Sequence, residues 1–210
     1  METREISQAV IARLPRYYRY LGDIQETGIT RISSSALSKK MNVTASQIRQ
    51  DLNNFGGFGQ QGYGYNVEFL RNEIGKILGL DENHNMVVIG AGNLGQAIAK
   101  YSAFERSGFY VVGIFDNDPK YIGASIRGIP ILMMEDLDSF LKKNKVDIAA
   151  LTIPRSALSD VTNVLVKNNI KSFLNFVLTD LNLPEDVVVE NVHLSDSLMK
   201  LSYNMKKNQS

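Results

Sequence analysis

The first apolar residues of the chain recur at helical spacing. From Ile6 to about Ile24 they return every three or four positions, which predicts an amphipathic helix. Pro15 lies inside this pattern and has no backbone N–H to donate, so we expect the helix to kink or split near Arg13 and Leu14. The beginning of the chain is therefore predicted to form two helical pieces.

Two more helical patterns and a glycine-rich stretch follow. Ser33, Ser34 and Ser35 are candidate N-caps for the first pattern, and Thr44 is the candidate for the second. Residues 55–65 include five glycines, which permit the positive φ angles of a hairpin. Helix, turn, helix and hairpin together predict a winged-helix domain.

A change of pattern marks a second domain. The segments are, in order, a helix over 67–78 that ends at Gly79, a strand over 86–89, the loop Gly90-Ala-Gly-Asn-Leu-Gly95, a helical run over 96–104, and a strand over 110–115 that ends in Asp116. A strand, a G-x-G-x-x-G loop, a helix and an acidic residue 21 positions after the last glycine predict a dinucleotide-binding fold.

The residues of this loop have distinct expected roles. Gly90 permits the tight turn, Gly92 lets a pyrophosphate approach the backbone, and Gly95 allows the helix to pack closely on the strand. Asp116 is expected to accept hydrogen bonds from the adenosine ribose and to repel the additional phosphate of NADP, which favours NAD(H). A glycine turn beside a surface acid is the alternative. The expected nucleotide contacts are Gly90, Ala91, Gly92, Asn93, Leu94, Gly95 and Asp116.

Alternating strands and helices continue and predict a Rossmann-like parallel sheet. The further strand candidates are residues 131–134, 148–153, 171–177 and 187–189, with helices over 136–143 and 155–168. Thr152, Pro154 and Phe176 lie at the carboxyl ends of strands, where ligands bind in such sheets. They are therefore candidates to line the nicotinamide half of a pocket, with loop packing the alternative for Pro154 and Phe176.

The C-terminal pattern from His193 to Lys206 predicts an amphipathic helix whose apolar face is too large to be left in water. The chain is thus expected to comprise a winged-helix domain with a linker helix over residues 1–80, a Rossmann domain over 81–192, and a C-terminal helix and tail over 193–210.

The second helix of the predicted pair is the element that would enter the major groove of DNA. Arginine and glutamine pair with guanine and adenine edges, while hydroxyls near a helix start bind phosphate. The arginines of the first helix are expected to neutralise phosphates, although they equally fit a solvated helix face. The hairpin is expected to enter a minor groove, although many such hairpins only turn the chain. The predicted DNA contacts are Arg13, Arg16, Ser35, Thr44, Ser46, Gln47, Arg49, Gln50, Asn53, Gln61 and Tyr63.

Composition narrows the class of protein. There is no cysteine, and no apolar run approaches the ~20 residues that cross a bilayer, so we expect a cytoplasmic protein with neither membrane nor metal among its partners. Residues 1–80 carry ten Lys and Arg against seven Asp and Glu, and the remainder carries thirteen against fifteen. This asymmetry points only weakly to a polyanionic partner for the first part.

An NAD-dependent dehydrogenase is the competing class, and it needs a proton donor beside the nicotinamide. The only histidines are His84, before a strand, and His193, at the tail; the one Tyr-x-x-x-Lys match, Tyr203 to Lys207, is at the C-terminus. The lack of a well-placed histidine or Tyr-Lys pair as proton donor disfavours an enzyme. A nucleotide-binding or CoA-binding regulatory subunit would leave the helix-turn-helix unexplained.

Three motifs together resemble the Rex family of redox-sensing repressors: VTASQIR at 43–49 with Asp51-Leu52, the wing ending GYGY at 62–65, and GAGNLG at 90–95. Asn175-Phe176 and Glu190-Asn-Val192 extend the resemblance to nearly the whole chain. It implies a homodimer that exchanges its tail helices and binds palindromic operator DNA. It also implies that NADH closes the molecule and releases DNA, whereas NAD+ leaves the DNA-binding form intact, so that the protein reads the NADH/NAD+ ratio.

The resemblance also implies an inter-domain switch, in which Tyr101 links the nicotinamide end to Arg19. The family usually has basic residues where this chain has Gln50 and Gln61, so we expect weaker or more salt-tolerant DNA binding. A family carboxylate of this switch is replaced by His193. Either Asp196 rebuilds the network or the NADH response is altered, with a pH dependence from the imidazole; a histidine with no such role is the alternative.

Overall fold

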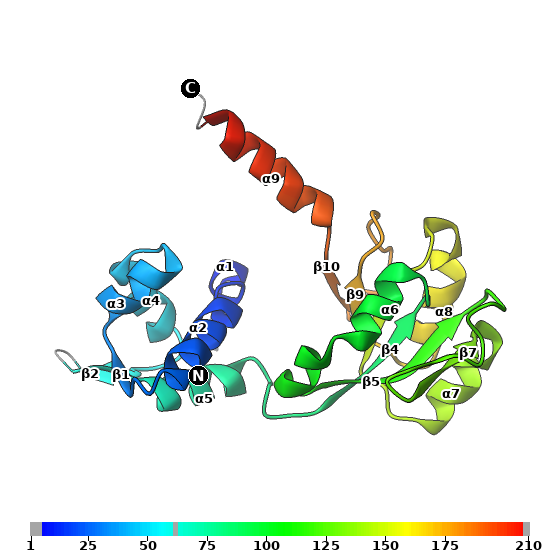
Figure 1. The fold of residues 1–210 in the computed structure, drawn as a ribbon, viewed down its shortest axis with the longest axis horizontal. Coiled ribbons are helices and arrows are strands. Elements are labelled where there is room, and N and C mark those ends of the chain that lie inside the picture. The colour runs from blue at the N-terminus through cyan, green and yellow to red at the C-terminus, as the bar shows by residue number, and fades with distance from the viewer. Residues whose placement is uncertain (1–5, 61–62, 208–210) are drawn as a thin grey trace. The chain divides into compact units, whose positions relative to one another are not determined.

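The computed structural model describes residues 6–60 and 63–207 (Figure 1). The chain divides into two compact units, Met1–Glu82 and Asn83–Ser210. Each unit has its own apolar core, and each is described separately below.

The first unit is a helical domain with a small sheet. Its elements are α1 (Gln8–Ile11), α2 (Leu14–Glu26), β1 (Arg31–Ile32), α3 (Ser34–Met41), α4 (Ala45–Asn53), β2 (Gly59–Gln60), β3 (Gly64–Asn66) and α5 (Val67–Ile77). The strands are antiparallel in the order β1-β3-β2, with Tyr65 opposite both Ile32 and Gly59. This is the predicted winged-helix arrangement, with β2 and β3 as the hairpin.

Local chemistry explains where these helices begin and end. The predicted split at Pro15 is confirmed, because α1 ends at Ile11 and α2 starts again with the proline in its first turn. Of the three candidate serines, Ser33 is the N-cap of α3: its Oγ accepts a hydrogen bond of 3.0 Å from the Ala36 amide. Thr44 caps α4 in the same way, with its Oγ1 3.0 Å from the amide nitrogen of Gln47.

A Rossmann-like sheet forms the centre of the second unit. Its strands are β4 (His84–Ile89), β5 (Phe109–Asp116), β6 (Ser125–Ile126), β7 (Ile129–Met133), β8 (Ile148–Leu151), β9 (Ser172–Asn175) and β10 (Val188–Asn191). Their order is β10-β9-β8-β4-β5-β7-β6, and every pair is parallel except β6 with β7. The predicted parallel sheet is thus confirmed.

Helices cover both faces of this sheet (Figure 1). The apolar core on the side of α6 (Asn93–Lys100) includes Val88, Ile98 and Ile114, and the core on the side of α7 (Leu137–Lys143) and α8 (Leu158–Lys167) includes Leu141 and Leu165. Residues on alternate sides of the strands supply the two cores, as expected for a sheet buried on both faces.

Several element bounds differ by up to three residues from the sequence prediction, and two differences are larger. The helix expected over 96–104 ends at Lys100, because Tyr101 has a ψ of 89° and the chain continues as a 3-10 helix, η1 (Ser102–Ser107). The short strand β6 was not predicted. It pairs with β7 through a two-residue turn in which Arg127 and Gly128 both have positive φ, of 53° and 82°, as a type I′ hairpin requires.

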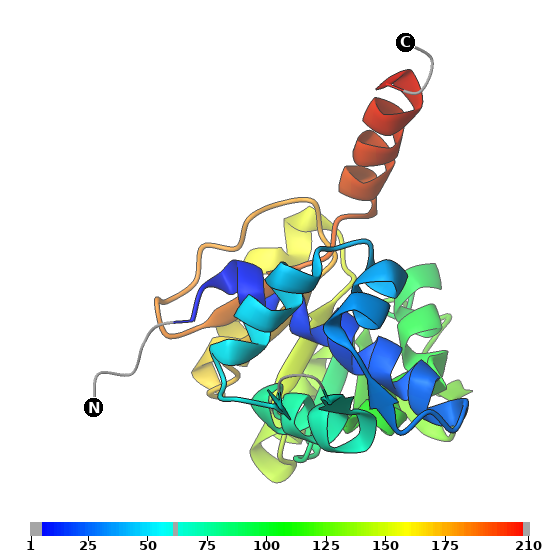
Figure 2. The same cartoon turned by 90° about the vertical axis from the view of Figure 1, so that its left-hand side faces the viewer.

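The tail helix α9 (Leu194–Lys207) exposes its whole apolar face. Figures 1 and 2 show it standing clear of the strands of its own unit. Its large apolar side chains are between 54% and 70% exposed: Leu194, Leu198, Met199, Leu201, Tyr203 and Met205. In residues 6–60 and 63–207, the structure has no helix with the length and apolar character needed to span a bilayer.

Candidate functional sites

A cavity of about 560 Å³ opens at the carboxyl ends of β4, β5 and β8. Strand order reverses between β4 and β8, so this is the switch point where open α/β sheets bind ligands. Pairing of Ile89 with both Phe115 and Leu151 brings the three strand ends together. The lining includes Gly90, Gly92, Asp116, Tyr121, Thr152 and Pro154. The volume lies in the range of small-molecule and cofactor sites.

The three glycines of the loop are needed for different reasons. Gly90 has a φ of 101°, and a Cβ there would lie 2.7 Å from the Thr152 carbonyl oxygen. A Cβ on Gly95 would lie 1.8 Å from the Gly90 carbonyl oxygen, so only glycine lets α6 approach the loop. Apart from the chain neighbours of Gly92, the N-cap of α6, no atom of the described residues lies within 4 Å of a Cβ built there. This bare helix N-terminus fits a pyrophosphate.

Asp116 and Thr152 hold the glycine loop in place. One Asp116 oxygen accepts a 2.5 Å hydrogen bond from the Ala91 amide, and the other accepts one of 2.8 Å from the Asp118 amide. The Thr152 hydroxyl lies 2.9 Å from the carbonyl oxygens of both Ile89 and Gly90. Asp116 thus lies at the cavity, where its expected ribose contact would be, but its carboxylate also fixes the loop.

The other predicted nucleotide residues have varied environments. Ala91 is buried, whereas Asn93 and Leu94 are exposed on the first turn of α6. Tyr101 is 58% exposed and packs edge-on against Phe104, with ring centroids 4.9 Å apart. Phe176 packs against the apolar core on the α6 side of the sheet, which is the packing alternative for this residue.

Sequence reasoning missed the loop after Asp116 as part of the cavity. Asn117, Asp118 and Tyr121 all line it. Lys120 forms an ion pair of 2.5 Å with Asp118 and lies 4.6 Å from the centre of the Tyr121 ring. The only sequence signal was their position directly after the acidic end of a strand.

Helix α4 of the first unit presents a polar outer face. Ser46, Arg49, Gln50 and Asn53 are exposed and surround, with Asn54, a polar hollow of about 470 Å³. The predicted readers other than Gln47 therefore share one surface. They follow Thr44, which is the exposed N-cap of α4.

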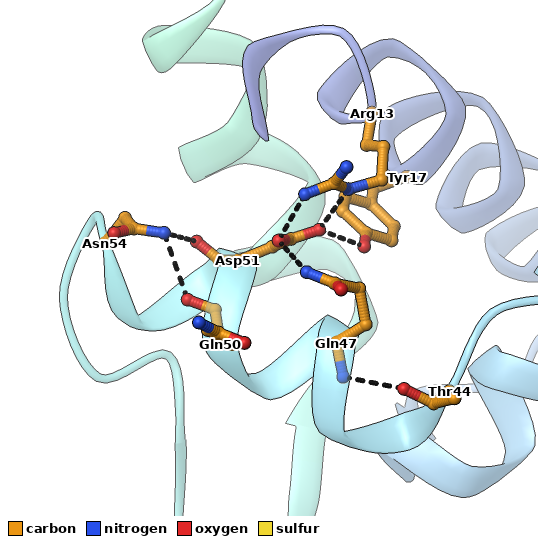
Figure 3. Close-up of polar contacts among 7 residues, drawn as sticks. All are labelled: Arg13, Tyr17, Thr44, Gln47, Gln50, Asp51 and Asn54. Atoms are coloured by element: carbon orange, nitrogen blue, oxygen red, sulfur yellow. Dashed lines mark hydrogen bonds and ion pairs between the residues drawn. The ribbon is translucent and has the colours of Figure 1, made fainter. Parts of the chain in front are cut away.

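Gln47 and Arg13 instead contact Asp51, a residue of the family-like motif to which the sequence assigned no role in the site (Figure 3). Asp51 is 0% exposed, and Arg13 binds it through two hydrogen bonds, Nε to Oδ2 at 2.6 Å and Nη2 to Oδ1 at 2.8 Å. The Arg13 charge is thus paired with a carboxylate of the protein. Neither of the two expected roles of Arg13, a phosphate contact or part of a solvated helix face, included this ion pair. An acidic residue one turn after Gln47, on the helix predicted to face DNA, was the available signal.

The environment of Asp51 changes the pKa of several groups. Burial raises the pKa of its carboxyl, but hydrogen bonds from Arg13, Tyr17 and Gln47 outweigh burial and hold this pKa below its ordinary value. Burial, followed by the hydrogen bond to Asp51, raises the pKa of the Tyr17 hydroxyl. At neutral pH the cluster is therefore an ionised carboxylate with a charged guanidinium and a neutral phenol.

The other predicted DNA contacts that the structure describes lie at the surface. Arg16 is exposed and donates a 2.7 Å hydrogen bond to the Met41 carbonyl oxygen; Ser35 is exposed on α3. Tyr63 is 70% exposed, and Arg31, which sequence reasoning missed, lies 6.0 Å from the centre of its ring and donates to its carbonyl oxygen. Gln61 lies outside the described residues.

The predicted switch residues belong to different units. Arg19 is exposed, and its Cζ lies 5.9 Å from the Tyr20 ring centre. His193 Nε2 lies 3.3 Å from the Val177 carbonyl oxygen and its Nδ1 lies 3.8 Å from Asp196 Oδ2, so the nearby acid is within ion-pair distance.

Asn175 has a structural part in the second unit. It is fully buried, and its Nδ2 donates to Asn191 Oδ1 at 2.7 Å while its Oδ1 accepts from the Val177 amide at 3.0 Å. Asn175 thus ties β9 to β10 and to the loop that contacts His193.

The fold and these sites define a DNA-binding protein with a nucleotide cavity in its second unit. Residues 5–53 match the family model described as Putative DNA-binding protein N-terminus, and residues 81–179 match CoA binding domain. The redox-sensing transcriptional repressor Rex of Clostridioides difficile (strain 630) is 56% identical over 204 residues, covering 97% of each chain. The chain belongs to the Rex family of redox-sensing transcriptional repressors.

Solved structures agree with this assignment. RSP, a Rex-family repressor, has been solved in complex with NAD+ and operator DNA, and that chain superposes with a TM-score of 0.92 at 54% identity, covering 98% of this chain and 95% of that one. RSP in complex with NADH has a TM-score of 0.91 at 51% identity, with 98% and 97% covered. The predicted family and fold class are confirmed, and the dehydrogenase alternative is not favoured.

Proposed function

We propose that this protein represses transcription by binding palindromic operator DNA as a homodimer, and that NADH in the second unit releases it. The observation that carries this proposal is the pairing, in one chain, of a capped helix-turn-helix with a bare glycine loop at a helix N-terminus. The first presents polar side chains suited to base edges, and the second presents backbone amides suited to a pyrophosphate.

In the DNA complex, α4 enters the major groove with Ser46, Arg49, Gln50 and Asn53 toward base edges. These four exposed side chains surround one polar hollow, which supports their acting together. Arg16 and the helix start at Thr44 contact phosphates, and Tyr63 of the hairpin approaches the minor groove. RSP, which is 54% identical, has been solved with operator DNA.

NAD(H) occupies the second-unit cavity as a sensed ligand. The pyrophosphate lies at Gly92, and the adenosine ribose lies beside Asp116, whose charge disfavours the additional phosphate of NADP. Thr152 and Pro154 line the nicotinamide half. NADH supplies no chemistry here beyond binding energy, and RSP has been solved with both NADH and NAD+.

The homodimer rests on the tail helix. A helix with six large apolar side chains more than half exposed requires a partner surface in water. A second copy of the chain that exchanges α9 supplies this surface and gives the two-fold symmetry that a palindromic operator matches. The dimer acts on DNA in the cytoplasm.

Release requires only that NADH bind the DNA-free state more tightly than the DNA-bound state. Each tenfold preference in NADH affinity changes the free-energy difference between the two states by about 1.4 kcal/mol, and the ligand need not touch DNA. Recognition helices of a two-fold dimer must lie about 34 Å apart, so a rotation that changes this spacing breaks two-site binding. Tyr101, Arg19 and His193 are the proposed links between nucleotide and rotation.

The test is fluorescence anisotropy of a labelled palindromic operator titrated with the full chain, alone, with NADH and with NAD+ at fixed salt. The proposal expects release by NADH and retention with NAD+. Arg49→Ala is expected to weaken binding, while Lys143→Ala, the same loss of charge at an exposed residue of α7, is the matched control. Binding that ignores both nucleotides would remove the sensing function, and absence of operator binding would remove the repressor function.

A further inference from the structure

The carboxylate of Asp51 is saturated with hydrogen bonds, although it lies on the helix that is proposed to read DNA (Figure 3). Oδ1 accepts from Arg13 Nη2 at 2.8 Å and from Gln47 Nε2 at 2.7 Å. Oδ2 accepts from Arg13 Nε at 2.6 Å and from the Tyr17 hydroxyl at 2.7 Å. Because an ionised carboxylate has about four acceptor sites, none is left for another partner.

These donors fix both the orientation of α4 relative to α2 and how closely the two helices pack. Ile48 and Leu52 bury the apolar side of α4, but apolar contact is not directional. Arg13 lies at the junction of α1 and α2 and binds Asp51 with two parallel bonds, which allow one relative geometry. Tyr17, one turn further along α2, adds a third bond to the same carboxylate. The cluster therefore sets the rotation of α4 about its own axis.

The same cluster decides how Gln47 presents its amide. One N–H of Nε2 donates to Asp51, and within residues 6–60 and 63–207 Oε1 and the second N–H have no hydrogen-bond partner. This free pair is the donor and acceptor that a bidentate contact with an adenine edge requires. A flipped amide would turn Oε1 toward the carboxylate, which repels it. Gln47 is half-buried on the flank of α4, next to exposed Ser46 and Gln50.

We propose that Asp51 is a positioning residue for base recognition, which holds the Gln47 amide in the one orientation that reads a base pair. Arg13 and Tyr17 then act on DNA recognition through Asp51, and Arg13 makes no phosphate contact. The inference rests on the proposed function, because it requires that α4 enter the major groove. It adds a residue that does not touch DNA to the set that determines sequence specificity.

The experiment begins with a duplex that the wild-type full chain selects from a randomised palindromic library. Affinities are then measured for that duplex and for its single base-pair substitutions, at fixed salt. The variants are Gln47→Ala, Asp51→Asn, the double variant, and Tyr17→Phe. Asp23→Asn, on the exposed face of α2, is the matched control. Far-UV circular dichroism and thermal unfolding check that each variant is folded.

The base pair read by Gln47 is the one at which Gln47→Ala loses discrimination, on the order of tenfold. We expect Asp51→Asn to lose discrimination at that same pair, Tyr17→Phe to lose part of it, and the double variant to lose no more than Gln47→Ala alone. Asp23→Asn keeps it. The inference is wrong if Gln47→Ala loses discrimination at no base pair, or if Asp51→Asn keeps discrimination at the pair that Gln47 reads. It is also wrong if the losses from Gln47→Ala and Asp51→Asn add in the double variant.

Two further outcomes keep the test decisive. If Asp51→Asn does not fold, Tyr17→Phe, which retains the ion pair, decides by its effect at that base pair. For Arg13, the slope of log affinity against log salt is compared between wild type and Arg13→Gln: an unchanged slope supports the proposal, and a loss of about one contradicts it. If the wild type selects no sequence at all, the proposed repressor function fails, and the inference fails with it.

Discussion

The two units treat their polar groups in opposite ways. In the first, the charge of Asp51 is enclosed and every lone pair is used within the protein. In the second, Gly92 leaves the start of α6 bare at a cavity. Saturated groups give no affinity to a partner but fix the geometry of the surface around them. Groups left bare can bind a partner, and under our two proposals this contrast separates positioning from binding in this protein.

The largest expected effect comes from filling the tightest glycine. Gly95→Ala places a Cβ 1.8 Å from the Gly90 carbonyl oxygen, so the loop or α6 must move. We expect the free energy of unfolding of the second unit to fall by on the order of 4 kcal/mol and NADH binding to be lost. Urea unfolding, with peptide hydrogen exchange to locate the loss in residues 83–207, measures this. Wild-type stability in the variant would contradict the packing role of Gly95.

Breaking the saturated cluster is expected to be nearly as costly. Arg13→Met leaves the Asp51 carboxylate buried without its counter-charge, and we expect the free energy of unfolding of the first unit to fall by about 3 kcal/mol. Arg16→Met is the control, because Arg16 is exposed and loses one hydrogen bond, at a cost of about 1 kcal/mol. Urea unfolding followed by circular dichroism compares the two variants. Equal losses of unfolding free energy would show that the Arg13–Asp51 ion pair stabilises the first unit no more than the single Arg16 hydrogen bond does.

Gly92→Ala tests the uncovered N-terminus of α6 in the second unit. Apart from chain neighbours, a Cβ there has no atom of residues 6–60 and 63–207 within 4 Å, and the φ of −67° suits any residue, so we expect stability to be unchanged. The methyl group would crowd a pyrophosphate at the helix start and weaken NADH binding by about tenfold. Isothermal titration calorimetry measures the affinity. Unchanged NADH affinity would place the pyrophosphate elsewhere.

The smallest effect is a pH dependence of the first unit. Because the pKa of Asp51 in the folded protein lies below the ordinary value of about 3.8, its carboxylate stabilises the fold above that pH. This contribution is lost as the pH falls through the lower folded pKa. The difference in stability between wild type and Asp51→Asn should therefore shrink from pH 5 downward, as urea midpoints would show. A difference that stays constant with pH would mean that Asp51 does not titrate as expected.

Much of the fold could be predicted because its signals are local. Pro15 cannot donate a backbone hydrogen bond within a continuous helix, and the Thr44 hydroxyl caps the helix that directly follows it. The spacing of Gly90, Gly92 and Gly95 between a strand and a helix is similarly a property of one short segment. The strand β6 was missed because two residues carry no period, and only the Arg127-Gly128 turn and its partner strand define it.

The residues of the candidate sites likewise fall into those that local sequence patterns indicate and those that only the tertiary structure brings together. The sequence alone determined the family, the two kinds of domain, the glycine loop and the exposed polar face of α4, because motif spacing and periodicity carry these. Only the tertiary structure decided that Arg13 pairs with Asp51, 38 positions along the chain, and that Tyr121 joins the nucleotide cavity. Side-chain pairing between distant segments depends on how helices and strands pack, and no local pattern records the distance between two atoms.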